Sequence, residues 1–524
     1  MNIAAFLEHW QVIENPFRGE EARHDPVFAR LAAASHTHPD FEKILGDLSR
    51  PASAIVFGEK GSGKTAIRLQ IADRIRAHNE AHPESKVLLI AYDDLNPMLD
   101  RFCVHMGLIS AGDDADGKSG HGAGGLDGRD VLRTLSKLRL VDHIDAILHV
   151  AVAWLVDAVL GRDAPAATAA GEAAKVLRRA DGQTKLDLLL LQALYDRPGV
   201  GIERTVSLRR ALRAPINWKR WLWMALAVLG WTPAASLAFH AHSMRHPLDG
   251  STWVSYALLG AIALWVILLL KQFGWEPLRV GHLARRLKKQ LRTVPRTAKS
   301  IADSLARIEP SLRDAAALPT NDLDDRRYAM LGRLMRIARL LGYGGAVVVI
   351  DRVDEPTLLA GSPERMRAVV WPLMNNKFLQ QDSIGVKMLL PIELRHELFR
   401  ESSAFFQEAR LDKQNFVERL SWSGSMLYDL CNARLNACRK EGAGNISLLE
   451  LFEQDVTRQD IIDALDHMHQ PRDAFKLIYQ CIAEHCAAVT ADADAWRIPK
   501  HVLEHVKKQQ VERVQMFYRG VRPA

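Results

Sequence analysis

The chain has 524 residues, of which 48% are hydrophobic and 25% charged, and its net charge is +7. This balance excludes a disordered chain and leaves room for two or three domains, each with its own core. The positive excess suits either nucleic acid or an anionic membrane surface. The five cysteines are irregularly spaced without a C-x-x-C pair, which argues against a disulfide framework and for a reducing compartment.

Helix-compatible segments over 25–34 and 40–48 lead into a glycine-rich sequence. Residues 54–57 (A-I-V-F) have the composition of a short buried strand, the next eight read G-E-K-G-S-G-K-T, and a helix-compatible run follows over 66–78. Strand, glycine loop and helix in this order are the signature of a phosphate-binding loop, and a chance glycine-rich turn is the alternative. The predicted nucleotide-binding residues of this loop are Gly58, Glu59, Lys60, Gly61, Ser62, Gly63, Lys64, Thr65 and Ala66.

Each part of such a loop has a role in holding a nucleoside triphosphate. Glycines let backbone N–H groups turn inward around a polyphosphate, and the following helix directs its positive end to the same place. We expect Lys64 to place its charge on the reacting phosphates and Thr65 to put its hydroxyl on Mg²⁺. The predicted ligands are therefore ATP and Mg²⁺, although the loop alone does not distinguish ATP from GTP.

The next segments predict one strand, one loop and one buried helix. Residues 86–92 (K-V-L-L-I-A-Y) form a continuous apolar run, as expected for a parallel strand buried on both faces. Gly, Asp and Ser dominate 110–128, which we expect to be a mobile surface loop. The pattern over 130–160 is helical and very apolar, but three aspartates keep it below membrane-spanning length. They are Asp142, Asp145 and Asp157.

Two segments without charge, 221–239 and 251–270, contain 19 and 20 residues. At about 1.5 Å per residue each spans roughly 30 Å, the thickness of the hydrocarbon layer. Tryptophans gather near their ends, as in the interfacial belts of membrane proteins. These are Trp218, Trp221, Trp223, Trp253 and Trp275. We expect a two-helix transmembrane hairpin over 218–275; two core helices of a soluble protein are the alternative.

The charges around these segments predict their orientation. Basic residues lie before the first segment and after the second, whereas the connecting loop over 240–250 carries only Arg245. They are Arg209, Arg210, Arg213, Lys219, Arg220, Lys271, Arg279, Arg285, Arg286, Lys288 and Lys289. The positive-inside rule then places both flanks, the nucleotide-binding domain and both termini in the cytoplasm. Residues 279–317 suit a basic amphipathic helix along or away from the membrane, or a solvated helix face.

A second motif follows an amphipathic helix expected over 325–341, which Gly342 would cap. Residues 346–350 (A-V-V-V-I) form a β-branched strand that ends at Asp351, where ligands of open α/β sheets bind. Asp351 is predicted to hold Mg²⁺ together with the loop threonine. Asp354 or Glu355 is predicted to orient and deprotonate the attacking water. The alternative for this acidic pair is a helix cap ahead of the next proline.

Two arginines are candidates for contacting the phosphates from outside these motifs. Residues 385–392 (G-V-K-M-L-L-P-I) look like the next strand, and Arg395 lies just beyond its end, where it could sense the γ-phosphate or simply open a helix. Arg472, at the start of an apolar helix, could reach the phosphates from a lid or belong to an ordinary first turn. The sequence leaves open which of the two is the sensor.

Together the glycine loop and the segment V-V-V-I-D-R-V-D-E resemble the STAND and AAA+ division of P-loop NTPases. In its NACHT-type subgroup the strand aspartate is followed by paired acids, as Asp351 is by Asp354 and Glu355, but a small residue usually stands where this chain has Arg352. A hydrophobic hairpin inserted between the two motifs resembles the KAP group, although KAP proteins usually carry a different acidic run at this strand. Pro471-Arg472-Asp473 is similar to the start of the helical lid of such ATPases.

The resemblance implies an α/β fold: a P-loop NTPase parallel sheet with a helical lid, interrupted by a helical insertion that carries the transmembrane hairpin. Residues 1–100 and 326–420 would form the two parts of the NTPase domain, the second with the Walker B strand. The expected remaining divisions are the insertion 101–217, the hairpin 218–275, a basic helical connector 276–325 and the lid domain 421–524.

The function expected from these features is that of a membrane-anchored ATPase working as a conformational switch. In the resembling groups such switches serve signalling and defence against phages or plasmids, often as homo-oligomers with a protein effector. A weakly hydrolysing membrane scaffold and an oligomeric pore are the alternatives, the pore being disfavoured because neither apolar segment carries a charge. Nucleic-acid binding by the basic C-terminal tail lacks a groove-reading motif. The residues of that tail are Lys500, Lys507, Lys508, Arg513, Arg519 and Arg522.

Overall fold

The computed structural model describes residues 1–19, 22–32, 37–109, 127–161, 167–198, 201–214, 218–243, 252–359, 361–490 and 494–518. The chain divides into two compact units, unit 1 (residues 1–95 and 345–524) and unit 2 (residues 96–344). The loop expected over 110–128 lies almost wholly outside the described residues, as do Arg519 and Arg522.

Unit 1 is an α/β unit built on a five-stranded sheet in the order β2-β3-β4-β1-β5. The strands are β1 (Ala54–Gly58), β2 (Lys86–Tyr92), β3 (Tyr343–Ile350), β4 (Ile384–Pro391) and β5 (Asn415–Val417). The pairs β3–β4, β4–β1 and β1–β5 are parallel. All residues of β1 and β4 are buried, which is why the sequence shows continuous apolar runs there.

Four of these strands match the strands predicted from the sequence, and the fifth was not predicted. β5 has only three residues, N-F-V, too few for a periodic pattern. The strand expected over 385–392 begins one residue earlier and ends at Pro391, and Ile392 starts helix α20 instead. In the observed register Gly58 lies opposite Pro391 and Ile350 opposite Met388, so β1 and β3 end near the same edge with β4 between them.

One charged side chain lies inside the sheet. Lys387 of β4 is fully buried, and its Nζ donates hydrogen bonds to the carbonyl oxygens of Leu45 at 2.8 Å and Ala52 at 2.7 Å. Burial lowers the pKa of Lys387 to about 8, because desolvation penalises the ammonium form. The two carbonyl oxygens satisfy a cation that would otherwise be costly in this core.

The helices of unit 1 gather around two hydrophobic cores. One joins the sheet to α3 and α4, whose Ile67, Ile71 and Ile75 repeat every four residues along the buried face. The other is formed by α1 and the C-terminal helices. The helix bounds are α1 (Ile3–His9), α2 (Pro26–Ala32), α3 (Phe41–Leu45), α4 (Lys64–Ala81), α18 (Pro363–Val370), α19 (Asn376–Leu379), α20 (Ile392–Phe399), α21 (Ser403–Ala409), α22 (Gly424–Ala437), α23 (Arg458–Asp466), α24 (Pro471–Ala488) and α25 (Lys500–Tyr518).

Unit 2 is helical. Its helices outside the hairpin are α5 (Asn96–His105), α6 (Gly128–Leu135), α7 (Leu140–Leu160), α8 (Ala167–Arg179), α9 (Gly182–Tyr195), α10 (Gly201–Ala211), α14 (Glu276–Gln290), α15 (Ala298–Leu305), α16 (Pro310–Ala315) and α17 (Asp324–Leu340). The helix predicted over 325–341 is α17, and Gly342 follows it with a φ of +87°. The single helical pattern over 130–160 proves to be two helices, α6 and α7, separated by a short turn.

Helix α7 is buried, as the sequence predicts, and each of its three aspartates has an arginine partner. Asp142 pairs with Arg292 at 2.5 Å, Asp145 with Arg327 at 3.4 Å and Asp157 with Arg204 at 2.6 Å. A buried carboxylate needs such a partner, since a lone charge in a core is very costly. The aspartates that interrupt the apolar run therefore belong to a protein core.

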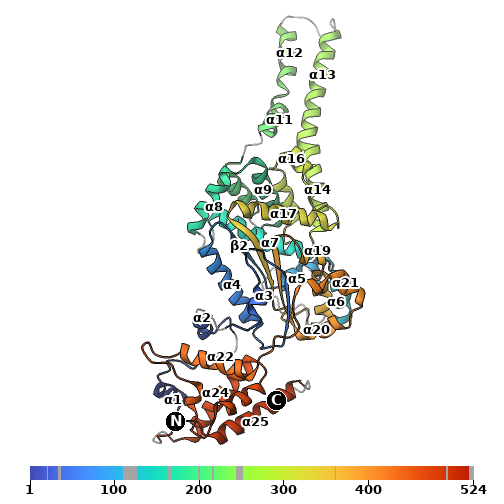
Figure 1. Ribbon diagram of the computed structural model, residues 1–524. Coiled ribbons are helices and arrows are strands. Elements are labelled where there is room, and N and C mark those ends of the chain that lie inside the picture. The colour runs from blue at the N-terminus through green and yellow to red at the C-terminus, as the bar shows by residue number, and fades with distance from the viewer. Residues whose placement is uncertain are drawn as a thin grey trace. The chain divides into compact units, whose positions relative to one another are not determined.

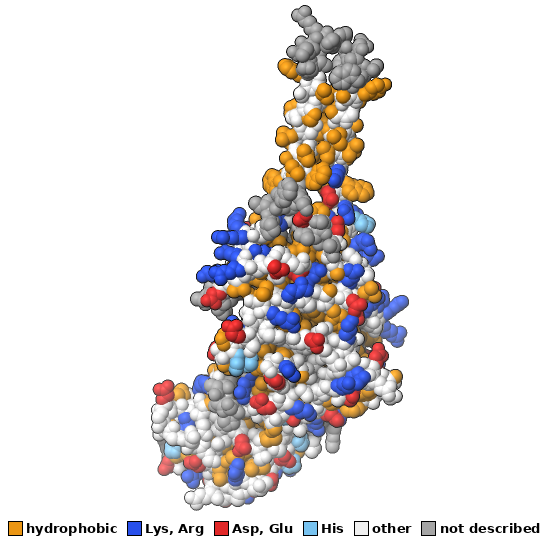
Figure 2. Space-filling view, turned by 45° about the horizontal axis from the view of Figure 1, so that its top comes forward, with side chains coloured by type: hydrophobic (Ala, Val, Ile, Leu, Met, Phe, Trp, Pro, Cys, Tyr) orange, Lys and Arg blue, Asp and Glu red, His pale blue; other side chains and the backbone are white. Residues whose placement is uncertain are grey.

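The two uncharged segments form a helical hairpin that projects from the rest of unit 2 (Figure 1). It consists of α11 (Trp218–Leu229), α12 (Thr232–Ser243) and α13 (Thr252–Leu269), and one π-helical turn, Leu270–Trp275, joins α13 to α14. Apolar side chains cover its described surface (Figure 2). By length and composition Leu140–Leu160, Trp221–Phe239 and Ser255–Gln290 qualify as membrane spans, and the buried shares of their apolar windows are 78%, 6% and 0%.

The uncharged segment 221–239 is not the single helix expected from the sequence, because a turn at Gly230 and Trp231 separates α11 from α12. Pro233 in the first turn of α12 has no N–H for the carbonyl of Leu229. The Thr232 hydroxyl donates to that carbonyl at 2.7 Å, and Trp265 Nε1 of α13 donates to the Ala227 carbonyl at 2.9 Å. Side chains thus satisfy backbone groups that the break leaves without a helical partner.

Candidate functional site

The glycine loop (Gly58–Thr65) connects β1 to α4 in the order that the sequence predicts. Gly61 and Gly63 have φ angles of +100° and +98°, where other residues are strained. A Cβ at Gly58 would lie 2.5 Å from Ser62 Oγ, so a side chain there would force the loop to shift. The residue before α4 is Gly63, which has no side chain to accept from the first-turn N–H groups, and these groups suit an anion.

Thr65 at the start of α4 and Asp351 at the end of β3 meet at the same edge of the sheet. Thr65 Oγ1 donates to Asp351 Oδ2 at 3.2 Å across a separation of 286 residues. Asp351 is 1% exposed, and its Oδ1 has no hydrogen-bond partner among the described residues. Burial raises the pKa of Asp351, and the Arg352 backbone N–H and the Arg68 guanidinium oppose that rise. The sequence predicts this convergence, and the structure brings the two side chains together.

Arg68 is a member of this cluster that the sequence analysis missed. It lies one helical turn after Thr65 on α4, its Nε is 3.5 Å from Asp351 Oδ2, and its NH1 is 2.5 Å from Asp93 Oδ2. Asp93 directly follows β2, so three elements of the sheet edge are linked by one guanidinium. The three-residue spacing between Thr65 and Arg68 on α4 and the aspartate after a buried strand were available as signals.

The Lys64 ammonium lies against the backbone of its own loop. Its Nζ donates to the carbonyl oxygens of Gly58 at 2.7 Å and Glu59 at 2.9 Å. Burial lowers the pKa of Lys64, and the carboxylates of Asp354, Asp351 and Glu393, in decreasing order, counter this effect.

The two acids predicted to activate water occupy different environments. Asp354 is half-buried, whereas Glu355 is exposed and accepts a hydrogen bond from Arg352 NH1 at 3.2 Å. Arg352 itself has a φ of +58°, a left-handed conformation that costs a non-glycine residue energy. The alternative interpretation as a helix cap is wrong, because a turn follows and the next helix, α18, begins only at Pro363.

Residues from the C-terminal half hold the glycine loop in place, and none of them was predicted. Glu59 accepts from Arg419 NH2 at 2.6 Å and from Gln470 Nε2. Trp422 Nε1 donates to the Ser62 carbonyl at 2.9 Å. Gln470 is the N-cap residue of α24, so the loop is bonded directly to the start of that helix.

Arg472 lies beside the loop at the start of α24, as predicted. A Cβ built on Gly61 would be 3.1 Å from the Cβ of Arg472, which shows how closely the two segments approach. Arg395 lies elsewhere, at the start of α20, where it pairs with Glu418 at 2.7 Å and stacks 4.7 Å from the centre of the Phe399 ring. Arg395 and Arg472 therefore approach the loop from different elements.

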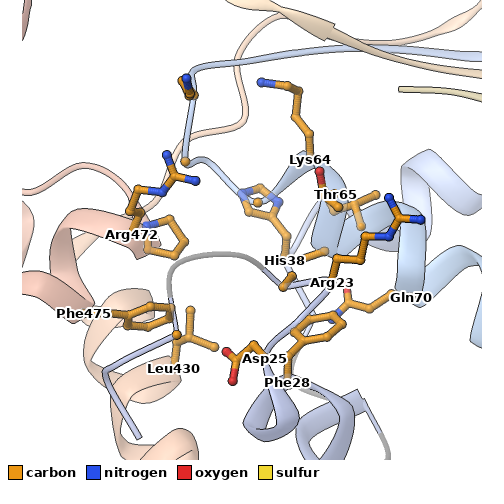
Figure 3. Close-up of a pocket in the computed structure, with 18 of the residues that line it drawn as sticks. Arg23, Asp25, Phe28, His38, Lys64, Thr65, Gln70, Leu430, Arg472 and Phe475 are labelled. Carbon is orange, nitrogen blue, oxygen red and sulfur yellow. The ribbon is translucent and has the colours of Figure 1, made fainter. Parts of the chain in front are cut away.

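A cavity of about 500 Å³ opens beside the glycine loop and is here named the first cavity. Figure 3 shows Lys64 and Thr65 at one end and Phe28, Leu430 and Phe475 at the other. Asp351, Asp354, Glu355 and Arg472 also line it. A cavity of this size, polar at one end and apolar at the other, suits a nucleotide-sized ligand.

The apolar end of the first cavity contains a buried ion pair. Arg434 NH1 lies 2.7 Å from Asp25 Oδ2, and the Arg434 guanidinium is 4.4 Å from the centre of the Phe475 ring. The arginine also donates from Nε to the Pro16 carbonyl at 2.7 Å. This pair ties α22 to the N-terminal segment and fixes the far wall of the cavity.

A second cavity, of about 570 Å³, is also lined by Lys64. Lys60, Lys64 and Asp354 line both cavities, whereas Arg395 lines only the second. Glu393, which follows the same strand as Arg395, and Arg419 also line the second cavity, and Arg419 was not predicted to contribute to the site.

Comparison with family models, curated proteins and solved structures finds no match to this chain. Among the described residues no group of three or more His, Cys, Asp or Glu side chains has the arrangement of a metal cluster. The site offers instead one hydroxyl, one buried carboxylate, a lysine and the N-terminus of α4.

Proposed function

We propose that this chain is a membrane-anchored P-loop NTPase that binds ATP with Mg²⁺ and hydrolyses it. The observation that carries the proposal is the 3.2 Å hydrogen bond between Thr65 and Asp351, which joins the two motifs. A hydroxyl at the start of the helix after β1 and a carboxylate at the end of β3, beside a glycine loop and a lysine, form the constellation that phosphoryl transfer uses.

The residues at this edge fit a magnesium ion. Mg²⁺ prefers hard oxygen ligands and keeps several waters, so one hydroxyl and one carboxylate suffice from the protein. Thr65 Oγ1 would bind the ion, and Asp351 would hold it through its buried Oδ1, which lacks a hydrogen-bond partner within the described chain. When bound, the ion neutralises charge on the phosphate oxygens.

The first cavity supports the rest of the nucleotide. The N–H groups of the glycine loop and Lys64 would hold the phosphates, with Lys64 exchanging its two loop carbonyls for phosphate oxygens. The base would lie among Phe28, Leu430 and Phe475 at the apolar end of the cavity. Arg472, at the start of α24, would reach the phosphates from the lid.

In the hydrolysis step, the oxygen of a water forms a bond to the γ-phosphorus while the bond from that phosphorus to the β–γ bridging oxygen breaks. ADP leaves with the electron pair of the broken bond, and the water proton passes to a carboxylate. Asp354 suits this role best, because it is half-buried and lines both cavities, whereas Glu355 is exposed and accepts from Arg352.

Mg²⁺-dependent ATP hydrolysis by the detergent-purified full chain tests this proposal. Lys64→Ala and Asp351→Ala should each abolish turnover. Arg400→Ala is a matched control, because Arg400 is 77% exposed and pairs only locally with Glu397. Undiminished turnover in either of the first two variants would refute the proposal.

The hairpin supports membrane anchoring. Its two apolar windows are 6% and 0% buried, and large exposed apolar surfaces mark contact with a membrane or a partner. Thr232 and Trp265 satisfy the carbonyls that the turn in the first segment frees, as a lipid environment requires. Arginines at both flanks favour a cytoplasmic location for the remaining chain.

Extraction of membranes with alkaline carbonate tests the anchor. Leu264→Arg with Ile267→Arg places two charges on α13 at side chains that are each 60% exposed, and should release the chain from the membrane. Leu323→Arg is the control, since Leu323 is 59% exposed but lies outside the hairpin. Retention of the double variant in the carbonate-resistant fraction would contradict the anchor.

A nucleotide-binding scaffold with little turnover is the second candidate, favoured by the exposed position of Glu355 and its hydrogen bond to Arg352. Tight ATP binding with negligible hydrolysis, unchanged by Glu355→Gln, would support it. Turnover that depends on Asp354 would support the ATPase instead.

A further inference from the structure

The second cavity adjoins the glycine loop without belonging to the volume that would hold the nucleotide. It shares Lys60, Lys64 and Asp354 with the first cavity, and the start of α20 and Arg419 line its outer part. Its volume of about 570 Å³ leaves room for a small ligand and its water. A phosphate group cleaved from the nucleotide beside Lys64 would therefore lie next to both the first and the second cavity.

The charges around the second cavity favour a small anion. Lys60, Lys64, Arg395 and Arg419 line it, against three carboxylates. Helix α20 begins at its wall, and the N-cap residue is Pro391, whose side chain cannot accept from the first-turn N–H groups. Those N–H groups add positive potential in the same place.

Arg395 and Arg419, the two arginines that line the second cavity, each pair with a carboxylate. Arg419 binds Glu59 at 2.6 Å and Arg395 binds Glu418 at 2.7 Å. Arg395 Nε is buried and has no hydrogen-bond partner in the described part of the chain. Arginine forks of this kind bind carboxylate and phosphate in the same geometry, so an incoming phosphate can take the place of Glu59 on Arg419.

We propose that the second cavity is a binding site for inorganic phosphate, held by Arg395, Arg419 and the start of α20. The inference rests on the proposed hydrolysis, of which phosphate is a product. Phosphate formed beside Lys64 enters this space while ADP stays in the first cavity. Glu59 of the glycine loop is then released from Arg419. Because Glu59 also accepts from Gln470, the N-cap residue of α24, this release changes the contact between the loop and that helix.

Titration of the full chain in detergent with inorganic phosphate, with Mg·ADP saturating, tests the proposal. The wild type should bind phosphate while ADP remains bound. Arg395→Ala and Arg419→Ala should weaken phosphate binding at least tenfold. Glu59→Gln should strengthen it several-fold, because it removes the charge that competes for Arg419. Arg400→Ala changes the C-cap residue of the helix that carries Arg395; Arg400 is exposed and paired with the nearby Glu397, so this variant should leave phosphate binding unchanged.

Arg419→Ala should weaken phosphate binding and Glu59→Gln, which removes the partner of Arg419, should strengthen it. A general loss of folding would not change the affinity in opposite directions. Phosphate that binds only when ADP is absent, or equally well to Arg395→Ala and Arg419→Ala, would overturn the inference. ADP binding without phosphate binding would reject the phosphate site alone. Failure of ADP itself to bind would instead reject the proposed function.

Discussion

The hydroxyl of Thr65 donates a hydrogen bond to the carboxylate of Asp351, 286 residues later in the chain. The two residues belong to different motifs and reach the same edge because β1 and β3 both pair in parallel with β4. Asp351 is buried, so its charge is available only to groups within the site.

The first prediction concerns the hydroxyl. Thr65→Ser keeps the oxygen and should retain ATP hydrolysis within a few-fold of the wild type. Thr65→Val keeps the shape but removes the hydroxyl proposed to bind Mg²⁺, and should lower turnover about 100-fold or more. Steady-state hydrolysis across a Mg²⁺ titration measures both. Equal activity of the two variants would show that the hydroxyl has no part in binding the ion.

The second prediction concerns the buried Lys387. Its pKa of about 8 in the folded chain lies below the ordinary 10.5, so between these values the folded state has lost a proton that the unfolded state keeps. Stability therefore rises with pH across this window, by roughly 1 kcal/mol per pH unit. The unfolding free energy of the wild type minus that of Lys387→Met should therefore increase from pH 8 to 10, because only the wild type gains stability from this titration. A difference that stays constant over this range would contradict the burial argument.

The third prediction concerns the core of unit 2. Arg204 and Arg197 both pair with Asp157 at 2.6 Å, but the Arg204 side chain is 3% exposed and that of Arg197 55%. Arg204→Met leaves Asp157 and Asp196 with a buried, poorly compensated charge and should cost about 3–5 kcal/mol. Arg197→Ala should cost about 1 kcal/mol or less. Thermal unfolding of both variants compares them, and similar losses would show that burial is not the deciding factor.

The fourth prediction concerns the hairpin. A Cβ on Gly230 would lie 2.9 Å from Trp265 Cδ1, whereas one on Gly260 would meet nothing within 4 Å. Gly230→Val should therefore separate α11 from α13 and lower the thermal stability in detergent, by about 1–3 kcal/mol for overpacking. Gly260→Val should leave it nearly unchanged. Stability that falls equally in both variants would point to helix propensity instead of packing.

Much of the fold was predictable because the decisive patterns are local. Buried strands appear as apolar runs, and β1 to β4 were found in this way. The helix break at Gly230 was not predicted, because an apolar segment with one proline is compatible with a continuous helix. The turn is stabilised by Trp265 from another segment, a contact that composition cannot show.

The site was predictable where a motif fixes its chemistry. The glycine loop and Asp351 were identified from their neighbours in the sequence, and Arg472 from the start of its helix. Arg419, Trp422 and Gln470 were missed, because they reach the loop only through the tertiary fold and lie in stretches without a pattern. The pairing of Glu355 with Arg352 likewise depends on a turn in which Arg352 has a left-handed backbone conformation, and the sequence does not predict that conformation.

Unit 2 begins after β2 and ends at β3, and these strands are neighbours in the sheet. A parallel crossover between neighbouring strands needs only a dozen or so residues, and the 17 residues of α17 alone meet that length. The part of unit 2 before α17 is thus an insertion that the connection between β2 and β3 does not require. A shortened chain in which α17 directly follows β2 is therefore expected to keep the strand order of the sheet.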